Sequence, residues 1–140
     1  MHEELIWQCY TQNELESIQL VNNRIKSLPV PFVVYLEGEV GAGKTFFCQE
    51  IARISDEDNL TSSSFLNFNI YLGKYKIIHV DYYYNSGSNK FFYENIFEEM
   101  DDNTILLSEW SPEYFDLGIT QFILKIVVES DMRKISFYSL

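Results

Sequence analysis

Residues 38–45 form the segment of this chain that most constrains its fold. They read Gly-Glu-Val-Gly-Ala-Gly-Lys-Thr, which fits the pattern G-x-x-x-x-G-K-[ST] of a phosphate-binding loop, the P-loop. Glycines let such a loop turn its backbone N–H groups inward, and the helix that follows adds the positive end of its dipole. The motif therefore predicts a strand before the loop and a helix after it.

The sequence on both sides of the loop fits this prediction. Residues 32–36 are an apolar run of β-branched and aromatic side chains, which is typical of a buried strand. Residues 46–54 have the periodicity of a helix with one apolar face. That face carries Phe47, Ile51 and Ile54. A glycine-rich turn that merely precedes a helix is the alternative, but it gives no packing reason for the sequence Gly43-Lys44-Thr45.

The rest of the chain alternates between helix-like and strand-like segments. A capping-box pattern at Thr11–Glu14 predicts the start of an amphipathic helix that stops before Pro29. Strands are expected at 66–72, 75–81, 104–108, 121–129 and 133–138, and a short helix is expected at 91–100. This order predicts an α/β fold, a three-layer P-loop NTPase-like sandwich with a mixed, mostly parallel central sheet and a C-terminal antiparallel hairpin.

Composition limits the domain organisation and the partners. The 140 residues are 46% hydrophobic, enough to build one core, so we expect a single P-loop domain over residues 1–140. A formal net charge of −11 argues against independent binding to a nucleic-acid backbone. Cys9 and Cys48 are too far apart to form a disulfide framework, and no apolar run reaches the roughly 18 residues of a membrane span. We expect a soluble, cytoplasmic protein.

Two acidic residues follow strand-like runs and are candidate partners of the P-loop. In P-loop enzymes the lysine of the motif, here Lys44, reaches the β- and γ-phosphates. The hydroxyl of the next residue, here Thr45, binds Mg²⁺. A carboxylate at the end of a nearby strand completes the site, and here Asp81 and Glu109 both end apolar runs. Each alone could be a solvated strand end, but beside a P-loop at least one is expected on the metal. Which of the two is the inner-sphere ligand stays open.

Residues 61–65, Thr-Ser-Ser-Ser-Phe, lie between the P-loop helix and the next strand. P-loop NTPases place a switch that senses the γ-phosphate in this part of the chain. Taken alone, the segment reads as a serine-rich turn.

Taken in order, four segments resemble the TsaE (YjeE) family of ATPases. They are the P-loop, Thr61–Phe65 against the family's T-S-P-T-F switch, His79–Tyr83 against its H-x-D-x-Y strand end, and Glu109-Trp110 against its E-W strand end. The resemblance implies an Mg²⁺-dependent ATPase subunit required for the threonylcarbamoyladenosine (t6A) modification of tRNA. It implies hydrolysis of ATP to ADP and phosphate in complex with TsaD and TsaB, with tRNA contacted only indirectly through that complex.

The same resemblance implies roles for individual residues. ATP or ADP is expected on Gly38, Glu39, Val40, Gly41, Ala42, Gly43, Lys44, Thr45, Phe46 and Arg133. The expected catalytic residues are Lys44, Asp81, Glu109 and Ser64, and the expected metal ligands are Thr45 and Glu109. His79 is expected to be structural rather than catalytic, and Trp110 either stacks near the nucleotide or is a buried core residue.

The chain departs from the family pattern near the expected switch. Ser63 stands where the family usually has proline, and Ser64 replaces a threonine but keeps a hydroxyl. Tyr84 stands where the family has arginine.

Three other functions fit a P-loop. A non-catalytic switch protein binds ATP or ADP without hydrolysing it, and the departures at Ser63 and Tyr84 leave this alternative open. A small-molecule kinase usually carries several arginines in a lid, whereas this chain has three arginines in all. A GTPase needs the motif N-K-x-D, and residues 89–92 read Asn-Lys-Phe-Phe.

Overall fold

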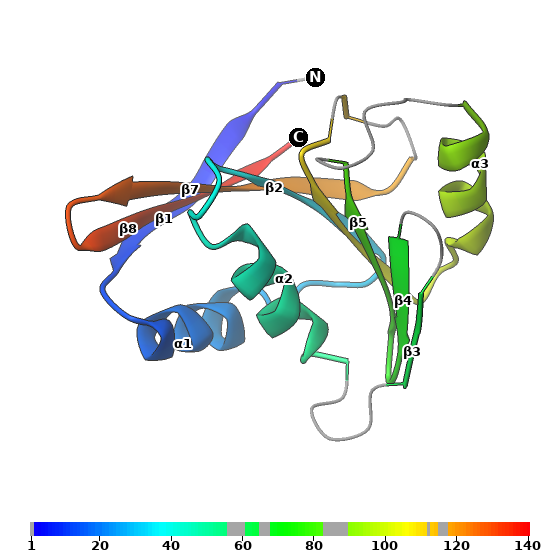
Figure 1. Cartoon of the computed structure of the whole chain (residues 1–140), viewed down its shortest axis with the longest axis horizontal. Helices are drawn as coiled ribbons and strands as arrows, with labels where there is room; N and C mark the ends of the chain where they lie inside the picture. Colours follow the sequence, from blue (N-terminus) through cyan, green and yellow to red (C-terminus); the bar gives the residue numbers. More distant parts are fainter. Residues whose placement is uncertain (1, 56–60, 65–67, 83–89, 112, 115–117) are drawn as a thin grey trace.

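The computed structural model describes residues 2–55, 61–64, 68–82, 90–111, 113–114 and 118–140; for 61–64 and 90–93 it describes the backbone. Its strands are β1 (Glu4–Thr11), β2 (Phe32–Glu37), β3 (Thr61–Ser64), β4 (Phe68–Leu72), β5 (Lys76–Asp81), β6 (Thr104–Glu109), β7 (Thr120–Glu129) and β8 (Met132–Ser139). Its helices are α1 (Glu14–Arg24), α2 (Lys44–Ala52) and α3 (Lys90–Glu99). Figure 1 shows these elements in sequence colours.

All the strands that are described join one sheet, in the order β1-β8-β7-β2-β6-β5-β4-β3. The four central strands run parallel, because β2 pairs in parallel with β6 and β7, and β5 pairs in parallel with β6. The outer pairs are antiparallel, including the hairpin β4–β5 and the predicted C-terminal hairpin β7–β8. The predicted mixed sheet is therefore present, with its parallel part at the centre and antiparallel pairs on both flanks.

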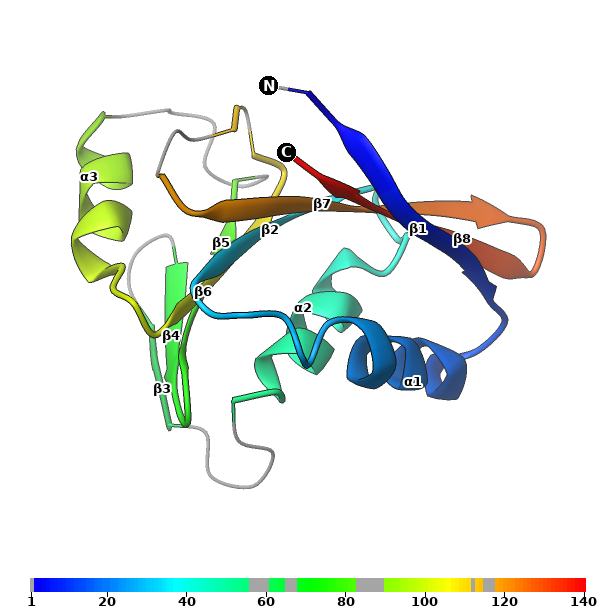
Figure 2. The same cartoon turned by 180° about the vertical axis from the view of Figure 1, so that it is seen from behind.

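Helices cover both faces of the sheet, which gives the three layers predicted from the sequence. Helices α1 and α2 lie side by side on one face, and α3 lies on the other, beside β5 and β4 (Figures 1 and 2). Apolar residues of α1 and α2 pack on the sheet in one core, with Val21, Phe47 and Ile51 almost fully buried. A second core forms on the opposite face, where Ile96 of α3 packs against the sheet.

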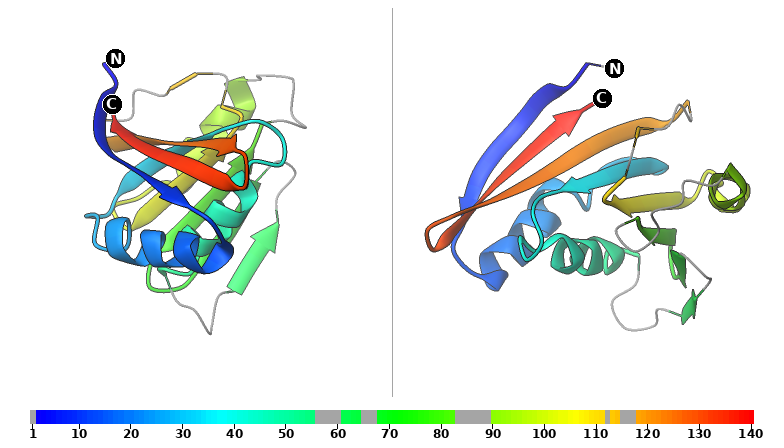
Figure 3. Two further views of the ribbon diagram at one scale, coloured as in Figure 1. Left: turned by 90° about the vertical axis from the view of Figure 1, so that its left-hand side faces the viewer. Right: turned by 45° about the horizontal axis from the view of Figure 1, so that its top comes forward.

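Strand β1 is absent from the elements predicted from the sequence. It pairs antiparallel with β8, so that β1, β8 and β7 lie side by side at one end of the sheet (Figure 3). Its side-chain alternation is broken by an irregularity between Leu5 and Trp7. Polar residues also interrupt the apolar pattern of this edge strand, and the two effects together hide its period of two.

The first helix begins two residues later than the capping box predicted. Its N-cap is Asn13, whose Oδ1 accepts a hydrogen bond from the backbone N–H of Glu16 at 2.9 Å. Thr11 is instead the last residue of β1, where it is buried and accepts a hydrogen bond from the Ser17 hydroxyl at 3.1 Å. Pairing with β8 holds Thr11 in the sheet, so Asn13 caps the helix in place of Thr11.

The sheet brings the ends of three parallel strands to one edge. Asp81 at the end of β5 is in register with Glu109 at the end of β6, and Glu109 is in register with Leu36 near the end of β2. The P-loop leaves the sheet at the same edge, directly after β2. In open α/β sheets this edge is where ligands bind. None of the helices in the described ranges has the length and apolar character needed to cross a membrane.

Candidate active site

The P-loop turns sharply between β2 and α2. Gly43 is the N-cap of α2 and has a φ of 110°, a left-handed value that side chains other than glycine rarely adopt. Gly38 is needed for a different reason, because a Cβ at this position would lie 2.8 Å from the backbone oxygen of Ile126. Within the part of the chain that the structure describes, no side chain caps the N-terminus of α2. The first N–H groups of this helix are therefore available to an anion.

Lys44 is folded back onto the loop that carries it. Its side chain is buried, and its Nζ donates to the carbonyl oxygens of Gly38 at 2.6 Å and Glu39 at 2.9 Å. The same ammonium group lies 4.2 Å from the centre of the Trp110 ring, within the range of a cation–π contact. An ammonium has three donors on a flexible stem, so Lys44 can exchange these carbonyls for phosphate oxygens.

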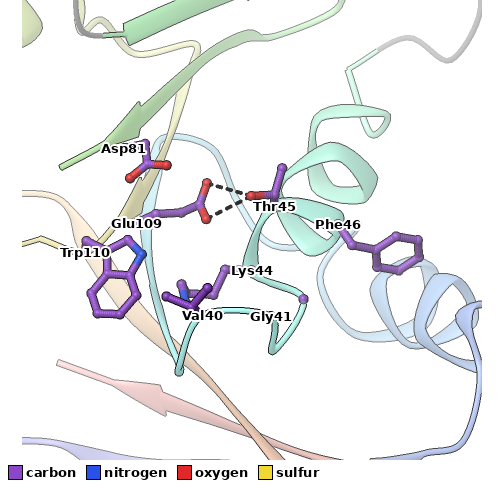
Figure 4. A pocket seen from close by; sticks show the side chains of 9 residues that line it. Val40, Gly41, Lys44, Thr45, Phe46, Asp81, Glu109 and Trp110 are labelled. Carbon is purple, nitrogen blue, oxygen red and sulfur yellow. Dashed lines mark hydrogen bonds between the residues drawn. The ribbon is translucent and has the colours of Figure 1, made fainter. Parts of the chain in front are cut away.

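Glu109 is the centre of the polar contacts in the site. Only 2% of its surface is exposed, and its carboxylate accepts a hydrogen bond from the Thr45 hydroxyl at 3.2 Å (Figure 4). His79 Nε2 lies 2.5 Å from the other carboxylate oxygen, Oε2. The sulfur of Cys48 also lies within 4.8 Å of a ligand oxygen of Glu109. These contacts compensate the burial of the carboxylate, which is otherwise costly.

A pocket of about 280 Å³ opens between the loop and the strand ends. It is lined by Val40, Gly41, Gly43, Lys44, Thr45, Phe46, Asp81, Glu109 and Trp110. Figure 4 shows that Asp81, Glu109 and Thr45 come from three different elements, whereas the Phe46 ring points away from Glu109. The structure thus brings most of the residues singled out in the sequence to one cavity.

Five predicted site residues lie outside the lining of this pocket. Gly38, Glu39 and Ala42 form the back of the loop, where the carbonyls of Gly38 and Glu39 receive Lys44. Arg133 reaches the loop from β8, and its Nε donates to the carbonyl oxygen of Ala42 at 2.8 Å.

The fifth of these residues, Ser64, ends β3, a strand that takes the place of the turn expected from its serine-rich sequence. Its backbone pairs with Asn69 of β4. Its side chain lies outside the described residues, as do Phe65 and Tyr84.

Two residues beside Glu109 were not predicted to take part in the site, since no role in it was assigned to Cys48 and His79 was expected to be structural. Cys48 is buried in α2, as a small core residue is expected to be, and lies on the same helix face as Thr45, three residues earlier. His79 shares a face of β5 with Asp81 because the two are separated by one residue. The spacing to Thr45 and Asp81 was the signal that could have found both.

Trp110 is not a core residue, because 39% of its surface is exposed. It has a φ of 57°, which turns the chain directly after β6 and places the indole beside the pocket. Of the two interpretations open from the sequence, the buried indole is therefore wrong.

Burial raises the pKa of the Cys48 thiol well above its usual value, and the negative charges of Glu109 and Asp81 raise it further. The thiol is therefore protonated at neutral pH. A cation at this position is attracted by the carboxylates of Asp81 and Glu109 and repelled by the ammonium group of Lys44. The local field favours a cation next to Glu109.

The donors of the site fit a nucleotide and Mg²⁺. Mg²⁺ prefers hard oxygen ligands, which the Thr45 hydroxyl and the Glu109 and Asp81 carboxylates supply in one pocket. The loop adds N–H groups, the end of α2 and the Lys44 ammonium for phosphate oxygens.

Comparison with known proteins agrees with this geometry. The sequence model of the family described as "Threonylcarbamoyl adenosine biosynthesis protein TsaE" matches residues 11–135. The chain belongs to the TsaE family. This match runs from the end of β1 to the middle of β8 and so includes every residue of the pocket.

Individual relatives of this TsaE family member come from Rickettsia. A protein of Rickettsia felis named "tRNA threonylcarbamoyladenosine biosynthesis protein TsaE" is 36% identical over 71% of this chain and 59% of its own length. Proteins of the same name from Rickettsia conorii and Rickettsia prowazekii are 38% and 40% identical, over 71% and 56% of this chain. The match spans 58% and 56% of those two relatives, so the chain corresponds to little more than half of each curated protein.

A solved structure shares the fold. The crystal structure of Bacillus subtilis YdiB superimposes with a TM-score of 0.69, covering 99% of this chain and 88% of YdiB. At 23% sequence identity, this likeness supports the architecture of the TsaE family member described above.

Proposed function

We propose that this chain is an Mg²⁺-dependent ATPase that serves the t6A modification of tRNA. It hydrolyses ATP to ADP and phosphate, and it works in a complex with proteins of the TsaD and TsaB type that hold the tRNA. The named relatives support the pathway, since their names place them in threonylcarbamoyladenosine biosynthesis. A cytoplasmic location follows as an expectation from a role in tRNA modification.

The observation that carries the ATPase proposal is the contact between Thr45 and Glu109. A P-loop hydroxyl and a strand-end carboxylate, joined at 3.2 Å, are the two protein groups that such enzymes use to hold Mg²⁺. A simple glycine-rich turn has no need for a buried carboxylate at this point. When bound, Mg²⁺ supplies positive charge where negative charge develops on the phosphate oxygens.

The side chains of the pocket then have distinct tasks. Lys44 leaves the carbonyls of Gly38 and Glu39 and binds the β- and γ-phosphate oxygens. Thr45 and Glu109 would hold the metal. Asp81, at the pocket wall, orients the water whose oxygen attacks the γ-phosphorus as the bond to the ADP oxygen breaks. Arg133 keeps the loop in place through its bond to the Ala42 carbonyl, next to the expected nucleotide.

The residues that line the pocket support an enzyme whose activity depends on a partner protein. Its lining, as far as the chain is described, contains no arginine, and the Nε of Arg133 is engaged by the loop backbone. Charge stabilisation in the transition state often comes from an arginine supplied in trans. We therefore expect slow hydrolysis by the chain alone and faster hydrolysis when a partner completes the site.

The hydroxyl of Ser64 is proposed to sense the γ-phosphate.

The test is ATP hydrolysis measured with and without Mg²⁺, and with and without the TsaD–TsaB complex of the same organism. We expect a weak Mg²⁺-dependent rate for the chain alone and a clear stimulation by the complex. Tight ATP binding without turnover in every condition would instead favour a non-catalytic switch. The hydrogen bond of Arg133 to the loop backbone is compatible with that alternative too. Transfer of phosphate to an added small molecule would indicate a kinase.

A further inference from the structure

Three potential metal ligands of different chemistry meet beside the proposed Mg²⁺ position. The Cys48 sulfur, a His79 ring nitrogen and a Glu109 oxygen all lie within 4.8 Å of one another. They come from α2, β5 and β6, which the parallel sheet and its packed helix hold in place. Cys48 and Glu109 are almost fully buried, and His79 is partly buried. The ligand atoms are therefore positioned by the core of the fold and not by a loop.

The donor types select the class of cation. A set of one sulfur, one imidazole nitrogen and one carboxylate oxygen suits Zn²⁺ and similar borderline metals, whereas Mg²⁺ takes oxygen ligands. Tetrahedral Zn²⁺, with bonds of about 2.3 Å to sulfur and 2.0–2.1 Å to nitrogen, places its ligand atoms roughly 3.3–3.7 Å apart. To bind Zn²⁺ in this geometry, His79 Nε2 and Glu109 Oε2, now 2.5 Å apart, must move slightly apart. Ligand atoms of the cluster that are up to 4.8 Å apart must move slightly closer.

The surroundings of the cluster also fit a cation. The Asp81 carboxylate is close enough to influence the Cys48 thiol electrostatically, as is that of Glu109. The Thr45 hydroxyl donates a hydrogen bond to Glu109 at 3.2 Å, and hydrogen bonds of this kind orient metal ligands in known sites. Of the three ligands, Glu109 lines the adjacent pocket, so a cation can reach the cluster from the side of Glu109, where a water can take the fourth coordination position.

We propose that Cys48, His79 and Glu109 form a binding site for one thiophilic divalent cation of the Zn²⁺ class. The cation displaces the thiol proton and the hydrogen bond between His79 and Glu109. Because Glu109 is also the proposed ligand of Mg²⁺, the two cations exclude each other. Zn²⁺ then inhibits the ATPase by occupying its metal position, a consequence that rests on the proposed function, whereas the binding itself does not.

Cobalt is the probe for this site, because a cobalt–thiolate bond gives a charge-transfer absorption band in the near ultraviolet. The chain has two cysteines, so Cys9→Ser is a matched control for Cys48→Ser. We expect the band to saturate at one Co²⁺ per chain in the wild type and in Cys9→Ser, to be lost in Cys48→Ser, and to disappear when Zn²⁺ is added. His79→Gln keeps the thiolate but removes a direct ligand. Loss of a residue that only hydrogen-bonds to a metal ligand weakens binding roughly 10–100-fold, so His79→Gln should weaken cobalt binding by at least that much.

A wild-type protein without the band, or a Cys48→Ser protein that keeps it, would overturn the proposal. X-ray absorption of the Zn²⁺-loaded wild type gives a second measurement that needs no variant, and a zinc environment without a sulfur ligand would have the same meaning. Inhibition is tested separately, by Zn²⁺ titration of partner-stimulated hydrolysis, and should be weaker in Cys48→Ser. If cobalt binds as expected but the protein never hydrolyses ATP, the site stands and the proposed function fails.

Discussion

The exchange of Lys44 between loop carbonyls and phosphates can be tested by Lys44→Met. Methionine keeps most of the buried stem and removes the ammonium, with its two hydrogen bonds and its contact with the Trp110 ring. We expect the variant to remain folded, because the two carbonyls belong to a partly exposed loop and can accept water instead. Nucleotide affinity should fall.

The size of the fall follows from two opposing contributions. A unit charge about 4 Å from another gains about 4 kcal/mol at an effective dielectric constant near 20, so two phosphate charges give about 8 kcal/mol. Leaving the two carbonyls costs about 1.5–3 kcal/mol for each hydrogen bond to the charged group. A net contribution of about 2–5 kcal/mol remains, which is at least roughly thirtyfold in Kd.

Calorimetric titration with a non-hydrolysable ATP analogue measures this difference directly. Lys26→Met is the matched control, since it removes the same charge from an exposed position after α1. We expect the control to bind as the wild type does. Equal affinity in Lys44→Met and the wild type would refute the assignment of this loop as the phosphate site, while equal losses in both variants would point to a general charge effect.

Three further predictions concern the metal, the loop and pH. Glu109→Gln should bind nucleotide within a few-fold of the wild type but lose Mg²⁺-dependent hydrolysis, and full activity by a phosphate-release assay would remove Glu109 from the mechanism. Gly38→Ala should lower stability by about 1–3 kcal/mol, because its Cβ meets a backbone oxygen of β7 at 2.8 Å; Gly41→Ala has open space and should cost about 1–2 kcal/mol of strain at its φ of 84°. Thermal unfolding compares the two, and a larger loss in Gly41→Ala would contradict the steric reasoning. Burial and a hydrogen-bonded carboxylate raise the pKa of Tyr114 in the folded state, so its contribution to stability is present below the ordinary value of 10 and is lost as pH rises above it. Tyr114→Phe should therefore flatten the fall of unfolding free energy in alkali, and an unchanged slope would show that this hydroxyl does not matter.

Local sequence signals were enough to predict the centre of the fold. The loop from Gly38 to Thr45 needs its flanking strand and helix, and the runs before Asp81 and Glu109 are apolar enough to be buried strands. Once these strands are parallel, their carboxyl ends meet at one edge, so the two carboxylates come together without any further information. The pocket follows from this register.

Contacts between distant segments could not be predicted in the same way. The bond from Arg133 to Ala42 depends on how far the C-terminal hairpin reaches across the sheet. Strand β1 joins the sheet only by pairing with β8, and the irregularity between Leu5 and Trp7 obscures its own pattern. The shift of the first helix cap from Thr11 to Asn13 has the same origin, because tertiary pairing took Thr11 into the sheet.

The position of Trp110 gives this protein an optical reporter of its own. Its indole is partly exposed and lies against the Lys44 ammonium, whereas Trp7 stacks on Phe137 in the core next to α1. Indole fluorescence responds to a nearby charge, so a phosphate that draws Lys44 away from the ring changes the emission of Trp110. In a Trp7→Phe background, where Trp110 is the single tryptophan, emission intensity then records occupancy of the loop in real time, without a label.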